Sequence, residues 1–166
     1  MPYSLTELNA LSQAEFKQVL GAIFEQTPQI AEQAWQLRPF DSVTDLHQKM
    51  LQVVAAISQA EQLALIQAHP DLGSKAKMAD ASVQEQAGAG LDRLSAEEFE
   101  RLHRLNQTYR DKFGFPFIIA VKNHTKASIL AAFEERIANS PEAERARALS
   151  EIGQIALFRL RDAVGE

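Results

Sequence analysis

The sequence predicts an all-α protein that folds as a single compact domain of about eight or nine helices over residues 1–166. Three observations lead to this prediction. Serine precedes glutamate by three residues, as in a helix capping box, just ahead of several apolar runs. The apolar residues in those runs recur at helical spacing. With 46% hydrophobic and 23% charged residues, the composition is that of an ordinary globular domain that can bury a core.

The first part of the chain contains four predicted helices. Ser12–Glu15 has capping-box form and opens the first of them, and Ser58–Glu61 opens the fourth in the same way. Thr27–Pro28 is typical of an N-cap followed by proline at the first helical position. Ser42 or Asp41 opens the third of these four helices. Its apolar stripe comprises Val43, Leu46, Met50, Val53, Val54 and Ile57.

The helical pattern weakens in the middle of the chain. Between residues 73 and 94 two glycines interrupt it, and only Ser82–Ala87 is expected to form one or two helical turns. Ser95 then opens a stronger helix, which Gly114 closes.

Phe115–Val121 is the most apolar stretch of the chain. Because no partner strand is evident, we interpret it as buried extended chain, whose backbone N–H groups could also form the wall of a ligand site. A helix starts after it at Thr125 or Ser128. Ser140–Pro141 opens the last helix, which should run to about Ala163.

Composition excludes several classes of function. A net charge of −5 offers no basic surface to a nucleic acid. The absence of cysteine excludes disulfides and thiolate metal sites and fits a reducing compartment. No apolar run approaches the roughly 18 residues of a membrane span, and the first residues lack the pattern of a signal peptide. We therefore expect no nucleic-acid or membrane partner.

Arg159 lies on the apolar side of the last predicted helix. At about 100 degrees per residue it falls within the arc of Ile152 and Leu160, whereas Arg161 falls opposite, beside Gln154. A buried cation needs a partner, because an unpaired buried charge is costly. Spacing alone favours a structural ion pair or a snorkelling side chain over ligand binding.

Other polar residues lie where the regular pattern breaks. His69 precedes Pro70, so it should sit at a helix end, within reach of a ligand. Glu85 completes a capping-box pattern that begins at Ser82, and Gln86 follows it. The residues alone favour a helix-end histidine, a capping glutamate and a surface glutamine. A histidine phosphotransfer module is a further alternative, against which the proline after the histidine argues.

No motif indicates a metal or cofactor. Glu100 and His103 have the spacing of a di-iron motif, but such sites need a second copy. There is no glycine-rich phosphate loop and no nucleophile elbow. The residues alone thus predict a helical domain with a candidate His–Glu–Arg pocket.

Four motifs, taken together and in order, resemble the OHCU decarboxylase family. OHCU is 2-oxo-4-hydroxy-4-carboxy-5-ureidoimidazoline, a late intermediate of urate breakdown. The resemblance extends from about Leu5 to Leu160. The motifs are His69-Pro70-Asp71-Leu72-Gly73, Ser82-x-x-Glu85-Gln86, Phe113-Gly114-Phe115-Pro116-Phe117 and Ile155-Ala156-Leu157-Phe158-Arg159-Leu160.

The resemblance implies an all-helical, homodimeric enzyme that needs no cofactor or metal and converts a small-molecule substrate, OHCU, into (S)-allantoin. Because this sequence does not end in the peroxisomal signal that eukaryotic members often carry, the resemblance also favours a cytoplasmic location. It implies that His69 and Glu85 are catalytic and that Arg159 contacts the substrate. Two alternatives are a non-catalytic helical interaction domain and a related decarboxylase acting on another ureido or imidazoline acid. The resemblance further implies substrate contacts from Pro70, Ser82, Gln86 and the backbone of Phe117, Ile118, Ile119, Ala120 and Val121.

Overall fold

The computed structural model describes residues 2–73, 80–91 and 93–165, and for residues 80–83 it describes the backbone alone. Within these ranges the regular structure is helical, apart from one isolated parallel bridge between Tyr3 and Val164. The all-α prediction is therefore confirmed. The chain forms two compact units, Met1–Ala68 with Gly153–Glu166, and His69–Ile152. The organisation as one domain stays a prediction.

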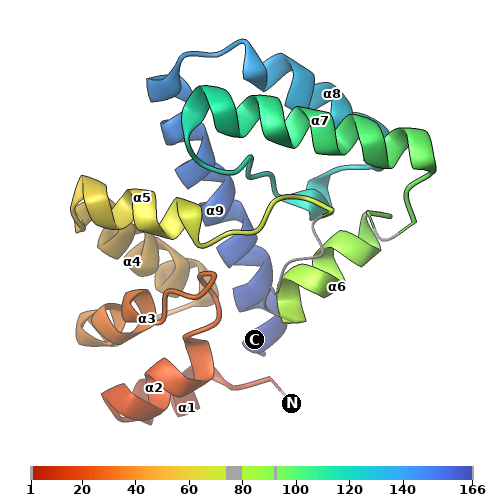
Figure 1. Cartoon of the computed structure of the whole chain (residues 1–166). Coiled ribbons are helices and arrows are strands. Elements are labelled where there is room, and N and C mark those ends of the chain that lie inside the picture. Colours follow the sequence, from red (N-terminus) through yellow and green to blue (C-terminus); the bar gives the residue numbers. More distant parts are fainter. Residues whose placement is uncertain (1, 74–79, 92, 166) are drawn as a thin grey trace. The chain divides into compact units, whose positions relative to one another are not determined.

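The first unit holds the N-terminal helices and the end of the last helix. Ser12 and Ser58 open α2 and α5 with capping boxes, and Ser42 caps α4, all as predicted. α3 begins one residue later than predicted, with Pro28 at the N-cap position. The elements are α1 (Leu5–Ala10), α2 (Gln13–Leu20), α3 (Gln29–Ala34), the 3-10 helix η1 (Trp35–Leu37), α4 (Val43–Ala56), α5 (Gln59–Gln67) and the C-terminal part of α9 (Pro141–Ala163; Figure 1).

The core of the first unit forms where α3 packs between α2 and α4. The two ends of the chain also meet in this unit. The Tyr3 N–H donates to the Ala163 carbonyl at 2.9 Å, and the Gly165 N–H donates to the Tyr3 carbonyl at 2.9 Å. The largest fully buried side chains of the unit include Leu8, Phe16, Leu20, Phe24, Ile30, Leu46, Met50 and Leu65.

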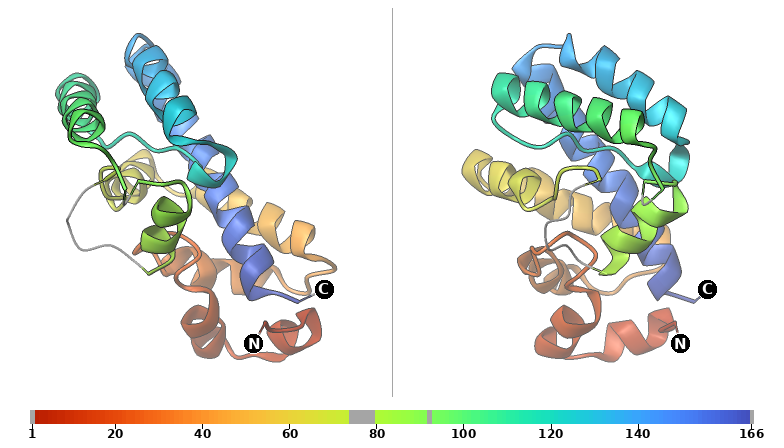
Figure 2. Two further views of the ribbon diagram at one scale, coloured as in Figure 1. Left: turned by 90° about the vertical axis from the view of Figure 1, so that its right-hand side faces the viewer. Right: turned by 45° about the vertical axis from the view of Figure 1, so that its right-hand side comes forward.

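The second unit contains the middle of the chain. Ser95 and Gly114 begin and end α7 as predicted, and Gly114 has the positive φ of 78° that favours glycine. α6 is longer than predicted, because it starts at Asp80 and includes Gly88 in its last turn. α7 and α8 lie side by side (Figures 1 and 2). The elements are α6 (Asp80–Gly88), α7 (Ala96–Phe113), the 3-10 helix η2 (Val121–Asn123), α8 (Lys126–Ile137) and the N-terminal part of α9.

An aromatic cluster forms the core of the second unit. The fully buried Tyr109 ring contacts the rings of Phe113, Phe115, Phe117 and Phe133 at centroid distances between 4.4 and 5.9 Å. Phe117 stacks on Phe133 at 3.8 Å. Residues 115–120 are buried and belong to no helix or strand, which confirms the prediction that this apolar stretch is buried outside regular structure. Ala120, with φ −74° and ψ 91°, is extended.

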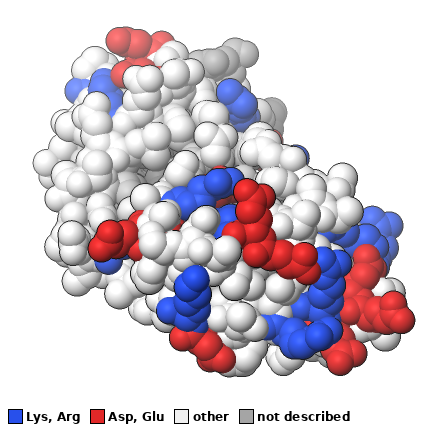
Figure 3. All heavy atoms as spheres, turned by 90° about the horizontal axis from the view of Figure 1, so that it is seen from above, with Lys and Arg blue, Asp and Glu red and all other residues white. Residues whose placement is uncertain are grey.

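The surface carries charges of both signs. Figure 3 shows lysine and arginine side chains next to aspartate and glutamate side chains on one face. In the part of the chain that the structure describes, no helix is both long and apolar enough to cross a bilayer. The same residues include no cluster of three histidine, aspartate or glutamate side chains suited to a metal ion.

Candidate functional site

His69 lies just after the C-terminal end of α5, as predicted. The helix ends at Gln67, and the N–H of its C-cap, Ala68, donates to the Ala64 carbonyl at 2.9 Å. Pro70 follows His69 and prevents the helix from continuing. The His69 side chain is only 7% exposed, so its imidazole lies in the protein interior. A turn thus holds the imidazole at a fixed point of the backbone.

The loop that carries His69 is bound by α6 and α7. The Gly73 N–H donates to Gln86 Oε1 at 3.0 Å, and the Leu72 carbonyl accepts from Asn106 Nδ2 at 3.0 Å. Arg110 Nε donates to the two Asp71 carboxylate oxygens at 2.9 and 3.2 Å. Three successive loop residues are therefore fixed by side chains from the two helices.

Gln86 and Glu85 lie on α6, and both are half-buried. The surface interpretation of Gln86 is wrong, because its side-chain oxygen accepts the Gly73 N–H. Since α6 begins at Asp80, Ser82 lies inside the helix, so Ser82 is not the N-cap that the capping-box interpretation of Glu85 requires. The Ser82 side chain, a predicted substrate contact, lies outside the described part of the structure.

The end of the segment formed by residues 117–121 lies against α6. Its last residue, Val121, begins η2, and α6 packs on η2. The Ile118 carbonyl accepts from Arg136 Nη1 at 2.7 Å, and the Ala120 N–H donates to Glu151 Oε1 at 3.1 Å. The second unit therefore brings together the helix of Glu85 and Gln86, the loop of His69 and the end of this segment.

Arg159 belongs to the first unit and lies on the buried side of α9, as its helical position predicts. It is 6% exposed, whereas Arg161 and Gln154 are exposed. Its Nη1 donates to Glu25 Oε2 at 3.2 Å and also faces the Ala22 and Ile23 carbonyls at 3.2 and 3.4 Å. The structural ion pair that the spacing favours is therefore present.

A buried polar network supports the second unit. Glu144, which is fully buried, accepts from Tyr109 Oη at 2.6 Å, Arg136 Nε at 2.9 Å and Asn139 Nδ2 at 3.0 Å. Burial and the hydrogen bond to the Glu144 carboxylate raise the pKa of Tyr109 well above its ordinary value. The phenol therefore stays a hydrogen-bond donor at physiological pH.

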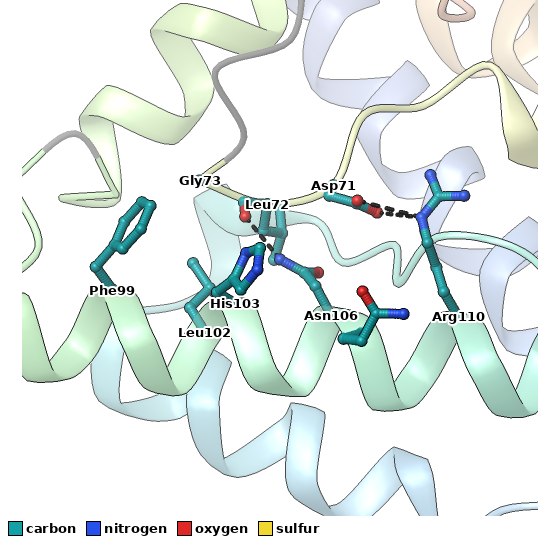
Figure 4. Close-up of a pocket in the computed structure, with 9 residues that line it drawn as sticks. Asp71, Leu72, Gly73, Phe99, Leu102, His103, Asn106 and Arg110 are labelled. Carbon is teal, nitrogen blue, oxygen red and sulfur yellow. Dashed lines mark hydrogen bonds and ion pairs between the residues drawn. The ribbon is translucent and has the colours of Figure 1, made fainter.

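The loop of His69 and α7 also line a pocket of about 260 Å³. Figure 4 shows the Asp71–Arg110 ion pair at one end and the Phe99 ring at the other. The Asn106 carbonyl oxygen Oδ1 is buried and makes no hydrogen bond within the described residues. Neither His69 nor Glu85 lines this pocket, so it is separate from the predicted catalytic pair.

Sequence reasoning missed the acidic partners of the buried cations. Glu25 lies in an irregular stretch with no helical period that would mark it as buried. Glu144 and Glu151 are seven residues apart and lie on one side of α9 with the buried Ala148. On the helical wheel used for Arg159, Glu144 and Glu151 lie about 80 and 100 degrees from Ile152, at the margin of the apolar arc, so the period alone does not mark them as buried.

The whole chain is similar to known proteins of one family. The OHCU decarboxylase family model matches residues 9–161. The chain is 43% identical to the 2-oxo-4-hydroxy-4-carboxy-5-ureidoimidazoline decarboxylase of Halalkalicoccus jeotgali over 96% of this chain and 90% of that protein. It is 33% identical to the Mus musculus protein of the same name over 97% and 93% of the two chains.

Longer proteins contain the same region. The chain is 45% identical to the uric acid degradation bifunctional protein of Bacillus subtilis over 99% of its own length but spans only 33% of that protein. Among solved structures, an (S)-allantoin synthase superposes with a TM-score of 0.83 at 32% identity, covering 99% of this chain and 54% of the other. An OHCU decarboxylase crystallised in the presence of (S)-allantoin superposes with a TM-score of 0.71 at 25% identity, covering 92% of this chain and 97% of the other.

An all-helical fold and similarity to named decarboxylases along its length define this protein as a carboxy-lyase. The family match covers every residue of the four sequence motifs. The chain belongs to the OHCU decarboxylase family.

Proposed function

We propose that the protein decarboxylates OHCU to (S)-allantoin in urate breakdown, without a cofactor. The observation that carries this proposal is the family match over residues 9–161, which includes all the proposed site residues. The relatives named above support the same reaction, since their printed names refer to OHCU, to uric acid degradation or to (S)-allantoin.

The substrate itself can accept the electrons of the reaction. When the bond from the ring carbon to the carboxylate breaks, CO2 leaves and its electron pair moves toward the adjacent carbon–nitrogen double bond. A carbon–carbon double bond forms, and the imine nitrogen takes a proton. The hydroxyl on the ring carbon that carried the carboxylate then loses its proton and becomes a carbonyl. A proton adds to the neighbouring ring carbon from one face and sets the S configuration. Many decarboxylases need a bound cofactor as the electron sink, and this substrate does not.

In this proposal His69 and Glu85 are the catalytic residues. His69 takes the hydroxyl proton or delivers the final proton, work suited to an imidazole that titrates near neutrality. Its burial supports this role, because a sheltered imidazole transfers a proton to one face of the substrate without exchange with bulk water. Glu85 holds the imidazole in the required protonation state and accepts hydrogen bonds from the ureido or ring N–H groups.

The remaining proposed residues bind and orient the substrate. Arg159 offers a planar fork of donors to substrate oxygens, which lysine does not reproduce. Backbone N–H groups of residues 117–121 are further donors, and Pro70, Ser82 and Gln86 complete the contacts. Homodimer assembly and a cytoplasmic location, both implied by the family resemblance, also belong to the proposal. Sedimentation velocity measures the assembly state.

The test uses OHCU generated from urate by the two upstream enzymes, with circular dichroism to follow the formation of (S)-allantoin. His69→Asn keeps the size and polarity of the side chain but removes the titratable group. We expect its turnover to fall by about 100-fold or more. His103→Asn is the matched control, because His103 is an exposed residue of α7, and it should keep normal turnover. Wild-type protein that leaves OHCU to decay at its spontaneous, non-stereospecific rate contradicts the proposed function, and normal turnover in His69→Asn contradicts the role of His69.

A further inference from the structure

The backbone of Ile118–Ala120 in the second unit is bound by two polar side chains, those of Arg136 and Glu151. Arg136 donates to the Ile118 carbonyl at 2.7 Å, and Glu151 accepts the Ala120 N–H at 3.1 Å. In extended chain the N–H and C=O groups of alternate residues point to the same edge. Ala120 has extended backbone angles of φ −74° and ψ 91°. By this alternation, the Ile118 carbonyl and the Ala120 N–H share the edge that contacts Arg136 and Glu151, and the Ile119 N–H belongs to the opposite edge.

The opposite edge is not used within the described residues. Ile119 is 2% exposed, yet its N–H makes no hydrogen bond to any group that the structure describes. Buried backbone donors are nearly always paired, with protein, water or a ligand. A donor left open on a buried segment suits a carbonyl oxygen of a small molecule, such as that of a ureido group.

The Arg136 side chain, which binds the Ile118 carbonyl, is itself held in place by other buried groups. Arg136 is 3% exposed, and its Nε donates to Glu144, which also accepts from Tyr109 of α7. Its guanidinium also lies over the Phe117 ring, 4.3 Å from the centroid. One side chain therefore sets both the Ile118 carbonyl and the ring that precedes it in the segment.

A buried ion pair of this kind is poorly explained by stability alone. Desolvating two charges offsets much of their attraction, and apolar replacements are often equally stable. Arg136 Nη2 is also buried without a hydrogen-bond partner among the described residues, a further cost. Holding the backbone in a fixed position is a better explanation for the presence of these charged side chains.

We propose that Arg136 and Glu151 are positioning residues that hold the Ile118–Ala120 backbone so that the Ile119 N–H donates to the substrate. This inference rests on the proposed function, in which residues 117–121 contact the substrate. Glu151 and Glu144 are two turns apart on α9, so one helix supplies both carboxylates. Neither Arg136 nor Glu151 needs to touch the substrate, since each acts through the backbone that it holds.

The experiment compares Glu151→Ala with Glu151→Gln, using OHCU turnover and binding of (S)-allantoin by calorimetry. Alanine removes the acceptor for the Ala120 N–H, whereas glutamine retains an oxygen that can accept it. We expect Glu151→Ala to raise KM and the allantoin Kd by about tenfold, with kcat changed less because the lost contact serves binding. Glu151→Gln should restore both values to near wild type. Glu134→Ala, which breaks the exposed Arg101–Glu134 pair in the same unit, is the control.

Two outcomes overturn the inference. One is a folded Glu151→Ala protein, judged by far-ultraviolet circular dichroism, with unchanged KM and Kd. The other is a Glu151→Gln protein as impaired as Glu151→Ala. If Glu151→Ala does not fold, Arg136→Lys replaces it, because lysine can still donate to the Ile118 carbonyl but cannot also bind Glu144 through a fork. Its KM should then rise, and an unchanged KM overturns the inference. Wild-type protein without OHCU turnover contradicts the proposed function instead, so the two failures are distinguishable.

Discussion

Replacing Glu25 tests whether the buried charge of Arg159 depends on a single carboxylate. The two residues are 134 positions apart in the chain, and Arg159 Nη1 donates to Glu25 Oε2 at 3.2 Å. Their side chains are 5% and 0% exposed, so water cannot replace the lost partner without a rearrangement. Glu25→Ala leaves the guanidinium buried, and Glu25→Gln keeps an acceptor but removes the charge.

The contacts around Arg159 set the expected loss of stability. Removing one partner of a buried pair typically costs about 3–5 kcal/mol. The Ala22 and Ile23 carbonyls still accept from Arg159 Nη1, so Glu25→Ala should fall at the lower end, about 3 kcal/mol. Glu25→Gln should cost about 1–2 kcal/mol, since the guanidinium keeps a hydrogen-bond acceptor but loses the opposite charge.

Urea unfolding followed by fluorescence measures these values, because the single tryptophan, Trp35, lies in the same unit as the pair. The control is Glu32→Ala, which breaks the exposed Lys17–Glu32 pair of that unit and should cost less than about 1 kcal/mol. If Arg159 also contacts the substrate, Glu25→Gln raises KM as well, because the guanidinium loses its anchor. A Glu25→Ala protein as stable as the Glu32→Ala control refutes the reasoning.

Two other changes have expected outcomes. The folded state holds the Tyr109 phenolic proton more tightly than the unfolded state, because burial and the Glu144 hydrogen bond raise the pKa of Tyr109. This contribution to stability is complete below about pH 10 and declines as the pH rises beyond it. Tyr109→Phe should therefore lessen the fall in the urea unfolding midpoint above that pH. An identical fall in the wild-type and Tyr109→Phe proteins argues against the raised pKa. Gly73→Ala should destabilise the protein by about 1–3 kcal/mol, because Gly73 has a φ of +69° and an added Cβ would lie 2.7 Å from Leu102 Cδ2. Because Gly73 lies in the loop that follows His69, turnover should fall too, and a Gly73→Ala protein with wild-type midpoint and turnover contradicts this assignment.

The helices follow from local signals that a short window of sequence contains. The capping boxes at Ser12, Ser58 and Ser95 open α2, α5 and α7 because their hydrogen bonds lie within one turn. α1 was missed because its six residues are too short to display a helical period. The start of α6 was placed too late, since the pattern there is weak and the favoured serine lies inside the helix.

The sequence by itself determined which positions are helical, which faces are apolar and, through the 3.6-residue period, that Arg159 is buried while Arg161 is exposed. Only the tertiary structure decided which carboxylate neutralises each buried cation, Glu25 for Arg159 and Glu144 for Arg136. It also decided that Gln86 binds the loop of His69 and that Arg136 and Glu151 hold the extended segment. The physical reason is range, because a helix is specified by neighbours within a few residues, whereas these polar partners depend on how whole elements pack.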